Sequence, residues 1–308
     1  MPPDLIQRLT LQGGIVPGAV SLILLGVLWW LHRRKAGLPR DDGESVGDGP
    51  RWLLPVLLAG GFFAADYVVK GSFEWWPTDN TKRAAHAALL LGVFGMVEGL
   101  VRLPRWAVAL GRALVFGALA WMLCEGYAPN TISTADLWGI VAICAILGSL
   151  IAHASDHGTE ASPGWAGALA WVVAVGAVQP LFHLGGFSGG SMALAGVLAV
   201  LSSTLIVSVF VKDVRLSRGG VTVIVGLLLA GLLGVGVQTG TDRVPALLLI
   251  AGVPLVFVLD AGGAKRSLLV RVVAIAAIAG TAAALLSFGG SGVEDSDEAD
   301  PYADFYGG

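Results

Sequence analysis

The stretch GSMALAGVLAVLSSTLIVSVFV, residues 190–211, carries no charged side chain along its whole length. An α-helix rises about 1.5 Å per residue, so a run of this length reaches across a hydrocarbon core of about 30 Å. The run also lacks the strict alternation of apolar and polar residues that a membrane β-strand shows over about ten positions. It therefore predicts an α-helix that spans a membrane.

Similar apolar runs recur on both sides of this stretch. Of the 308 residues, 55% are hydrophobic and 13% are charged, whereas soluble domains carry about 25% charged residues. Ten spans are expected, at 14–31, 52–69, 84–101, 106–124, 137–153, 164–184, 190–211, 220–238, 244–260 and 267–288. Because a spanning backbone must satisfy its own hydrogen bonds, we predict an all-α fold, a polytopic integral membrane protein with a bundle of about ten transmembrane helices.

The polar segments divide the chain into a helical domain and a tail. Residues 1–290 are predicted to form a single transmembrane helical domain, with a polar cytoplasmic loop at 32–51. The tail at 291–308 is acidic and too poor in apolar residues to order itself. It is expected to be a solvated disordered chain. The alternative is a docking peptide that binds a protein partner through Tyr302, Phe305 and Tyr306.

Basic residues predict how the chain is oriented. The connections after odd-numbered spans hold twelve lysines and arginines, and the opposite side holds five. Since basic loops stay in the cytoplasm, both termini are expected on the non-cytoplasmic side of a plasma or inner cell membrane. The lipid bilayer is the expected partner. Because no basic stripe exists, nucleic-acid binding is not expected.

Ionisable residues inside apolar spans are costly and need a partner or water. Glu98 lies near the end of the third span and Arg112 near the start of the fourth, with a short turn between them. The two side chains can therefore meet, in competition with a Glu98–Arg102 pair along one helix. Asp260 and Arg271 repeat the arrangement around the last turn. These four residues are expected to form structural ion pairs, or alternatively gating pairs.

A second group of charges gathers at the opposite ends of the second to fourth spans. It comprises Asp66, Lys70, Arg83, His86 and Glu125. Asp66 and Lys70 are four residues apart and share one helix face. One interpretation is an interfacial belt of solvated charges. The other is a substrate or ion site, in which Asp66 and His86 are the best proton or ligand groups, because an imidazole changes charge near neutral pH.

Motifs that carry cofactor chemistry are absent from the sequence. There is no Walker A pattern, no dinucleotide fingerprint and no HExxH motif, so neither a cofactor nor a metal site is predicted. The residues Gly186-Phe187-Ser188-Gly189 resemble the nucleophile motif of rhomboid intramembrane proteases. That family also needs a histidine on a later helix, and no histidine follows His183.

Three functions are therefore compared. The leading hypothesis is a transporter of a small solute or an ion, with a polar site in the second to fourth spans. Charged residues inside membrane spans are costly, so their presence there indicates a function. The alternative is a non-catalytic membrane subunit or scaffold of a larger complex. The third is a membrane-embedded enzyme acting on lipid or glycan, which the sequence favours least because it shows no nucleophile with a base.

Overall fold

The computed structural model describes residues 7–35, 50–75, 77, 80–101, 103–127, 131–211, 214–216, 218–239, 243–260 and 262–288. Most of the loop predicted at 32–51 lies outside these residues, and so does the whole tail at 291–308 with its three aromatic side chains. Every regular element among the described residues is helical. The prediction of an all-α fold is confirmed.

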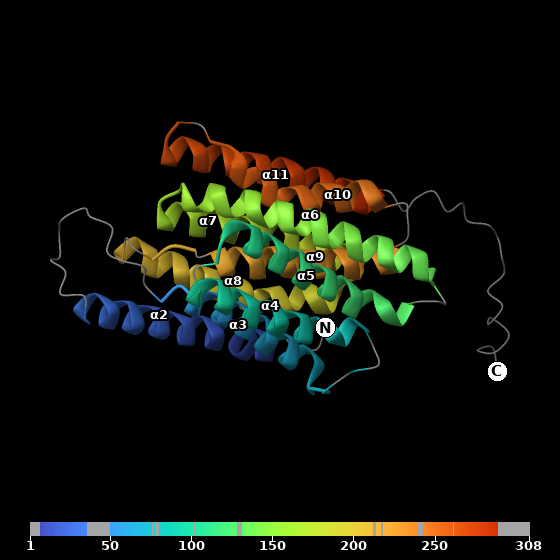
Figure 1. The fold of residues 1–308 in the computed structure, drawn as a ribbon, viewed down its shortest axis with the longest axis horizontal. Helices are drawn as coiled ribbons and strands as arrows, with labels where there is room; N and C mark the ends of the chain where they lie inside the picture. Colours follow the sequence, from blue (N-terminus) through green and yellow to red (C-terminus); the bar gives the residue numbers. More distant parts are fainter. Residues whose placement is uncertain are drawn as a thin grey trace.

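The helices lie side by side as an elongated bundle (Figure 1). The described part of the chain contains α2 (Val16–Lys35), α3 (Leu53–Lys70), α4 (Ala84–Leu100), α5 (Arg105–Cys124), α6 (Thr134–Glu160), α7 (Gly164–Leu184), α8 (Ser188–Phe210), α9 (Arg218–Thr239), α10 (Val244–Gly252) and α11 (Ala264–Phe288). Short π or 3-10 segments adjoin them: η1 (Leu9–Ile15), η2 (Asn80–Arg83), η3 (Glu125–Tyr127) and η5 (Val253–Val258).

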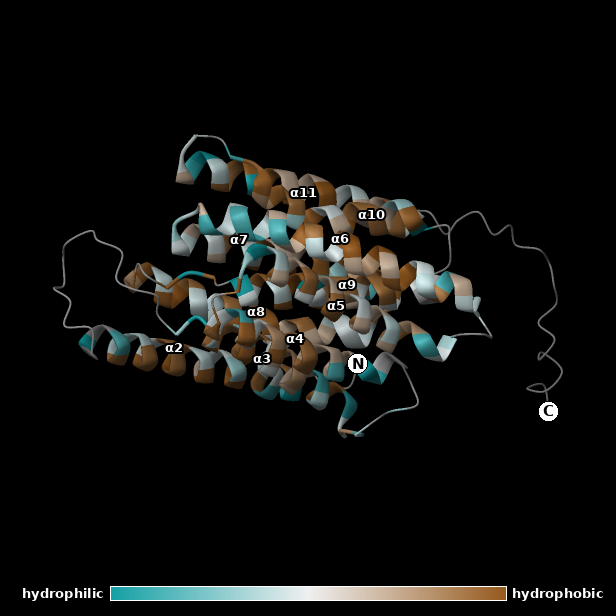
Figure 2. Cartoon of the chain, in the orientation of Figure 1, coloured by the Kyte–Doolittle hydropathy of each residue, from teal (hydrophilic) through white to brown (hydrophobic). Residues whose placement is uncertain are grey.

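The lengths and compositions of these helices are those of membrane spans. Eight are long and apolar enough to cross a bilayer, and Ala84–Leu100 and Val244–Val258 are shorter apolar helices. Hydrophobic residues cover most of the helix lengths in Figure 2, and hydrophilic residues gather towards many of their ends. The ten predicted spans correspond one to one with these helices, which form an all-α polytopic membrane bundle.

Two elements differ from their predicted spans. The fifth span was expected to end at residue 153, whereas α6 continues to Glu160. The ninth was expected to be one helix, but α10 ends at Gly252 and the chain goes on as the 3-10 helix η5. Pro254 explains this break, because proline has no N–H for an α-helical hydrogen bond. Its carbonyl accepts a hydrogen bond of 2.8 Å from the Ser155 hydroxyl of α6.

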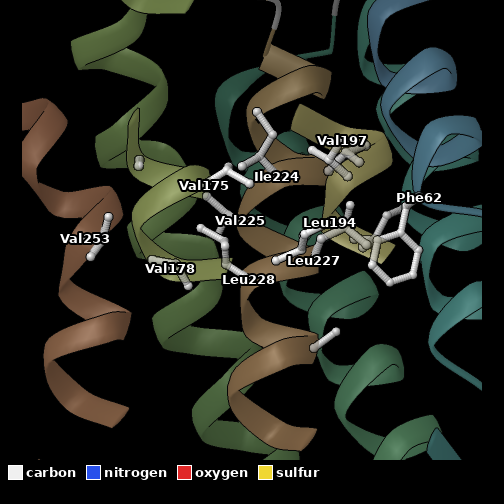
Figure 3. Close-up of a cluster of buried hydrophobic side chains, with 14 of the residues drawn as sticks. Phe62, Val175, Val178, Leu194, Val197, Ile224, Val225, Leu227, Leu228 and Val253 are labelled. Atoms are coloured by element: carbon white, nitrogen blue, oxygen red, sulfur yellow. The ribbon is translucent and has the colours of Figure 1, made fainter. Parts of the chain in front are cut away.

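The apolar core is centred on α9. In its most hydrophobic window 72% of the residues are buried, against 17% for α11 at the edge of the bundle. Side chains of α7, α8 and α9 converge there, with Phe62 of α3 and Val253 of η5 at either side (Figure 3). The peripheral helices therefore leave most of their apolar surface facing outward, as lipid contact requires.

Close helix crossings at glycine hold α3 and α4 against α8 and α9. A Cβ atom added to Gly196 of α8 would lie 1.9 Å from the Gly61 carbonyl oxygen of α3. One added to Gly219 of α9 would lie 2.0 Å from the Gly95 carbonyl oxygen of α4. Small residues at such crossings let two backbones approach closely. These contacts set the spacing of the helices that carry the charges described next.

Candidate functional site: a buried charge network

Arg112 of α5 lies at the centre of a group of charges at one end of the bundle. Its side chain is 0% exposed, and its Nε donates to Glu98 Oε1 of α4 over 2.9 Å. Its Nη2 donates to Asp156 Oδ2 of α6 over 3.2 Å and to the Arg218 carbonyl of α9 over 3.4 Å. One guanidinium therefore joins the three consecutive helices α4, α5 and α6 to the distant helix α9.

Both carboxylate oxygens of Glu98 accept hydrogen bonds. Its side chain is 1% exposed, and its second oxygen, Oε2, accepts a hydrogen bond of 2.6 Å from the Thr222 hydroxyl of α9. Hydrogen bonds to charged groups are roughly twice as strong as neutral ones. The two bonds tie the end of α4 to both α5 and α9.

The outer part of the network lies nearer to the surface. Arg218 donates to Glu160 Oε1 over 2.9 Å, and each of these side chains is 41% exposed. The Arg218 Nε also lies 3.7 Å from Asp156 Oδ2. We call Glu98, Arg112, Asp156, Glu160, Arg218 and Thr222 the Arg112 network. Asp156 occupies its middle, between the buried guanidinium and the half-exposed one.

The charges of the network do not balance. Glu98, Asp156 and Glu160 are three carboxylates, and Arg112 and Arg218 are two guanidinium groups. Two buried atoms, Arg112 Nη1 and Asp156 Oδ1, have no hydrogen-bond partner among the described residues. An unpaired polar atom away from water is costly, so these two atoms are the least satisfied polar groups of the network.

The sequence identified part of this network. It placed Glu98 near Arg112, and the structure brings the two together. Arg102, the competing partner, lies outside the described residues. Asp156 was missed because residues 154–163 were assigned to a loop. The signal was present, since the buried residues Ser149, Ala152, Asp156 and Thr159 recur at helical spacing along α6.

Arg271 of α11 occupies a second buried position near the same end of the bundle. Its guanidinium donates to the carbonyl oxygens of Phe257 over 2.9 Å, Leu259 over 3.1 Å and Gly158 over 3.3 Å, and to the Ser162 hydroxyl over 2.6 Å. Asp260 accepts a hydrogen bond of 2.7 Å from Ser267. Arg271 thus ties α11 both to the carbonyl groups at the end of η5 and just after it and to the last turns of α6.

At the opposite end of α3 and α4, Asp66 is 3% exposed and pairs with Lys70 over 2.8 Å. The imidazole of His86 stacks on Phe73, with ring centroids 5.0 Å apart, and Phe73 packs edge-on against Phe63. Gly71, with φ of 72°, turns the chain after α3 so that Phe73 can reach this position. We call Asp66, Lys70, Phe73 and His86 the Asp66 cluster.

The other two predicted site residues form a separate pair. Arg83 donates to Glu125 Oε2 over 2.8 Å and to the carbonyl oxygens of Pro77 and Met122. These contacts join the start of α4 to the end of α5. The five residues that the sequence grouped together thus make separate contacts: Asp66 pairs with Lys70, His86 stacks on Phe73, and Arg83 pairs with Glu125.

Two arrangements that carry catalysis in other proteins, a metal centre and a nucleophile with a base, can be compared with the described residues. No group of three or more His, Cys, Asp or Glu side chains among them is arranged to hold a metal ion. Ser188 starts α8, and no hydrogen bond of the described residues links it to His183. A nucleophile without a base does not make a hydrolase site.

No family model, no curated protein and no solved structure matches this chain. The fold defines its class as a multi-pass helical membrane bundle. What the bundle does must be inferred from the Arg112 network and the Asp66 cluster.

Proposed function

We propose that this protein is a transporter of a small solute or an ion. In this proposal the Asp66 cluster binds the transported species, and the Arg112 network is a gate at the other end of the same helices. The observation that carries the proposal is the complete burial of Arg112 between two carboxylates, because ionisable residues inside membrane helices commonly mark substrate or ion pathways.

The network has properties suited to a gate. It joins α4, α5, α6 and α9 through charged hydrogen bonds and not through apolar packing alone. Water can replace charged hydrogen bonds when helices separate, whereas separated apolar surfaces gain nothing from water. A polar contact can therefore alternate between closed and hydrated states, as a gate must.

The position of α4 supports a link between the two ends. His86 lies in its first turn and Glu98 in its last, so a shift of this one helix moves both groups. Phe73 covers His86 from the segment that follows α3. If the basic connections face the cytoplasm, as the charge pattern predicts, the network is the inner gate and Asp66 lies towards the outside.

The proposal is tested with purified protein in liposomes. Currents on a solid-supported membrane are recorded while ions, amino acids, sugars and organic anions are applied in turn. We expect at least one of them to evoke a current that Asp66→Asn and His86→Ala abolish. Asp136→Asn is the control, because Asp136 is an exposed residue whose carboxylate bonds to Ser133 at the start of α6.

The opposing outcome favours a membrane subunit. If no species evokes a current and mass spectrometry of the detergent-purified protein finds stoichiometric partners, the Arg112 network is a structural lock. A companion variant that lacks residues 291–308 then shows whether the acidic tail holds those partners.

A further inference from the structure

Asp156 differs from Glu98 in how well its negative charge is stabilised. Glu98 accepts bonds of 2.9 and 2.6 Å, one on each oxygen. Among the described residues, the side chain of Asp156 accepts one hydrogen bond, of 3.2 Å, on Oδ2, and the Arg218 guanidinium is 3.7 Å from that same oxygen. Its Oδ1 is buried and has no hydrogen-bond partner among the described residues. Asp156 is thus the carboxylate of the network with a free valence.

Counted together with Asp156 itself, the charged groups around it leave an excess of one negative charge. Arg112 approaches from α5 and Arg218 from α9, while Glu98 of α4 shares Arg112, and Glu160 lies one turn further along α6. Two positive charges therefore face three negative ones. A buried carboxylate that is not fully compensated tends to take up a proton.

The outer part of the network separates Asp156 from the surface. Glu160 and Arg218 are each 41% exposed, whereas the side chain of Asp156 is 7% exposed. Asp156 thus lies one layer below the surface, with an acidic and a basic side chain above it. A proton from water needs to pass only that pair.

We propose that Asp156 Oδ1 is a proton-binding site. A proton from bulk water forms an O–H bond at Oδ1, no other covalent bond changes, and the carboxylate becomes a neutral carboxylic acid. Neutral Asp156 no longer attracts Arg112 and Arg218 as an anion, so the proton loosens the contacts that join α6 to α5 and α9. That this proton drives transport rests on the function proposed above, whereas the site itself does not.

The test uses infrared difference spectra of the full chain in liposomes, recorded between alkaline and acidic buffer. We expect a C=O band of a buried carboxylic acid to appear on acidification. Aspartate that carries a heavy carbon isotope in its carboxyl group should shift the band in the wild-type protein. Asp156→Asn should remove it, and Asp66→Asn, which changes the other aspartate that is buried in the described part of the chain, should leave it intact.

Several results would overturn the proposal. Three of them are the absence of any such band, a band that the labelled aspartate does not shift, and a band that Asp156→Asn leaves unchanged. If Asp156→Asn fails to fold, a band that labelled aspartate shifts and that Asp66→Asn leaves intact still assigns the proton to an aspartate other than Asp66, and a band that Asp66→Asn removes overturns the proposal. A band of the expected kind in a protein that evokes no currents would preserve the proton site and reject the transporter.

Discussion

Replacing Arg112 by methionine is the strongest perturbation that the structure offers. Methionine keeps most of the side-chain length but removes the charge that Glu98 and Asp156 share. Arg112 makes two charge-assisted hydrogen bonds to these carboxylates, and each such bond contributes about 1.5 to 3 kcal/mol. Removing one partner of a buried ion pair typically costs about 3 to 5 kcal/mol, because the other charge is left without compensation.

The remaining partners of Glu98 and Asp156 place the expected loss of unfolding free energy near the lower end of this range. Glu98 keeps its bond to Thr222, and Asp156 keeps Arg218 at 3.7 Å. We therefore expect Arg112→Met to lower the free energy of unfolding by about 3 kcal/mol. The assay is reversible unfolding in mixed detergent micelles, followed by tryptophan fluorescence. In acidic buffer the loss should shrink, since protonation neutralises the stranded carboxylates.

The matched control removes all three charges together. In Glu98→Gln/Arg112→Met/Asp156→Asn no buried charge lacks a partner, so the variant should be more stable than Arg112→Met alone. The reasoning is refuted if Arg112→Met unfolds within about 1 kcal/mol of the wild type. It is equally refuted if the triple variant loses as much stability as the single one.

Three further predictions test other parts of the structure. Gly61→Ala should destabilise the bundle by about 1 to 3 kcal/mol in the same unfolding assay, because the added Cβ meets a backbone carbonyl at 2.7 Å, whereas Gly60→Ala, which meets nothing within 4 Å, should be neutral or stabilising. Arg271→Met should speed amide hydrogen exchange across 253–259, since the carbonyl groups there lose their guanidinium donor; unchanged exchange would mean that water replaces the arginine at no cost. An impermeant maleimide applied to intact cells should label Ser296→Cys in the tail but not Ser45→Cys in the polar loop, and the reverse pattern would invert the predicted orientation.

The positions of the helices were largely readable from the sequence. The span predicted at 164–184 coincides with α7, and the span predicted at 84–101 ends one residue beyond α4. Long apolar runs bounded by charged or proline-rich segments leave few other solutions in a membrane. The exceptions have local causes. The last turns of α6 are rich in polar residues, so the apolar pattern did not predict them as part of the helix. Pro254 interrupts the helix after α10, and the chain continues as the 3-10 helix η5.

The candidate site was only partly readable. Glu98 and Arg112 are separated by one short turn, and helices joined in this way pack against each other. Asp156 and the Arg218 backbone, by contrast, contact Arg112 across 44 and 106 positions of sequence. Nothing in the spacing of residues specifies which distant helices become neighbours.

The sequence by itself determined the fold class and most of the helix boundaries, because the bilayer sets the length of a span and its backbone bonds are local. The tertiary structure decided how the helices cross. The Gly61–Gly196 and Gly95–Gly219 contacts bring α3 and α4 against α8 and α9. That packing places Thr222 within hydrogen-bond distance of Glu98. The packing of α6 against α5 likewise places Asp156 beside Arg112. Charge pairing between distant helices is a property of packing, which no single apolar run encodes.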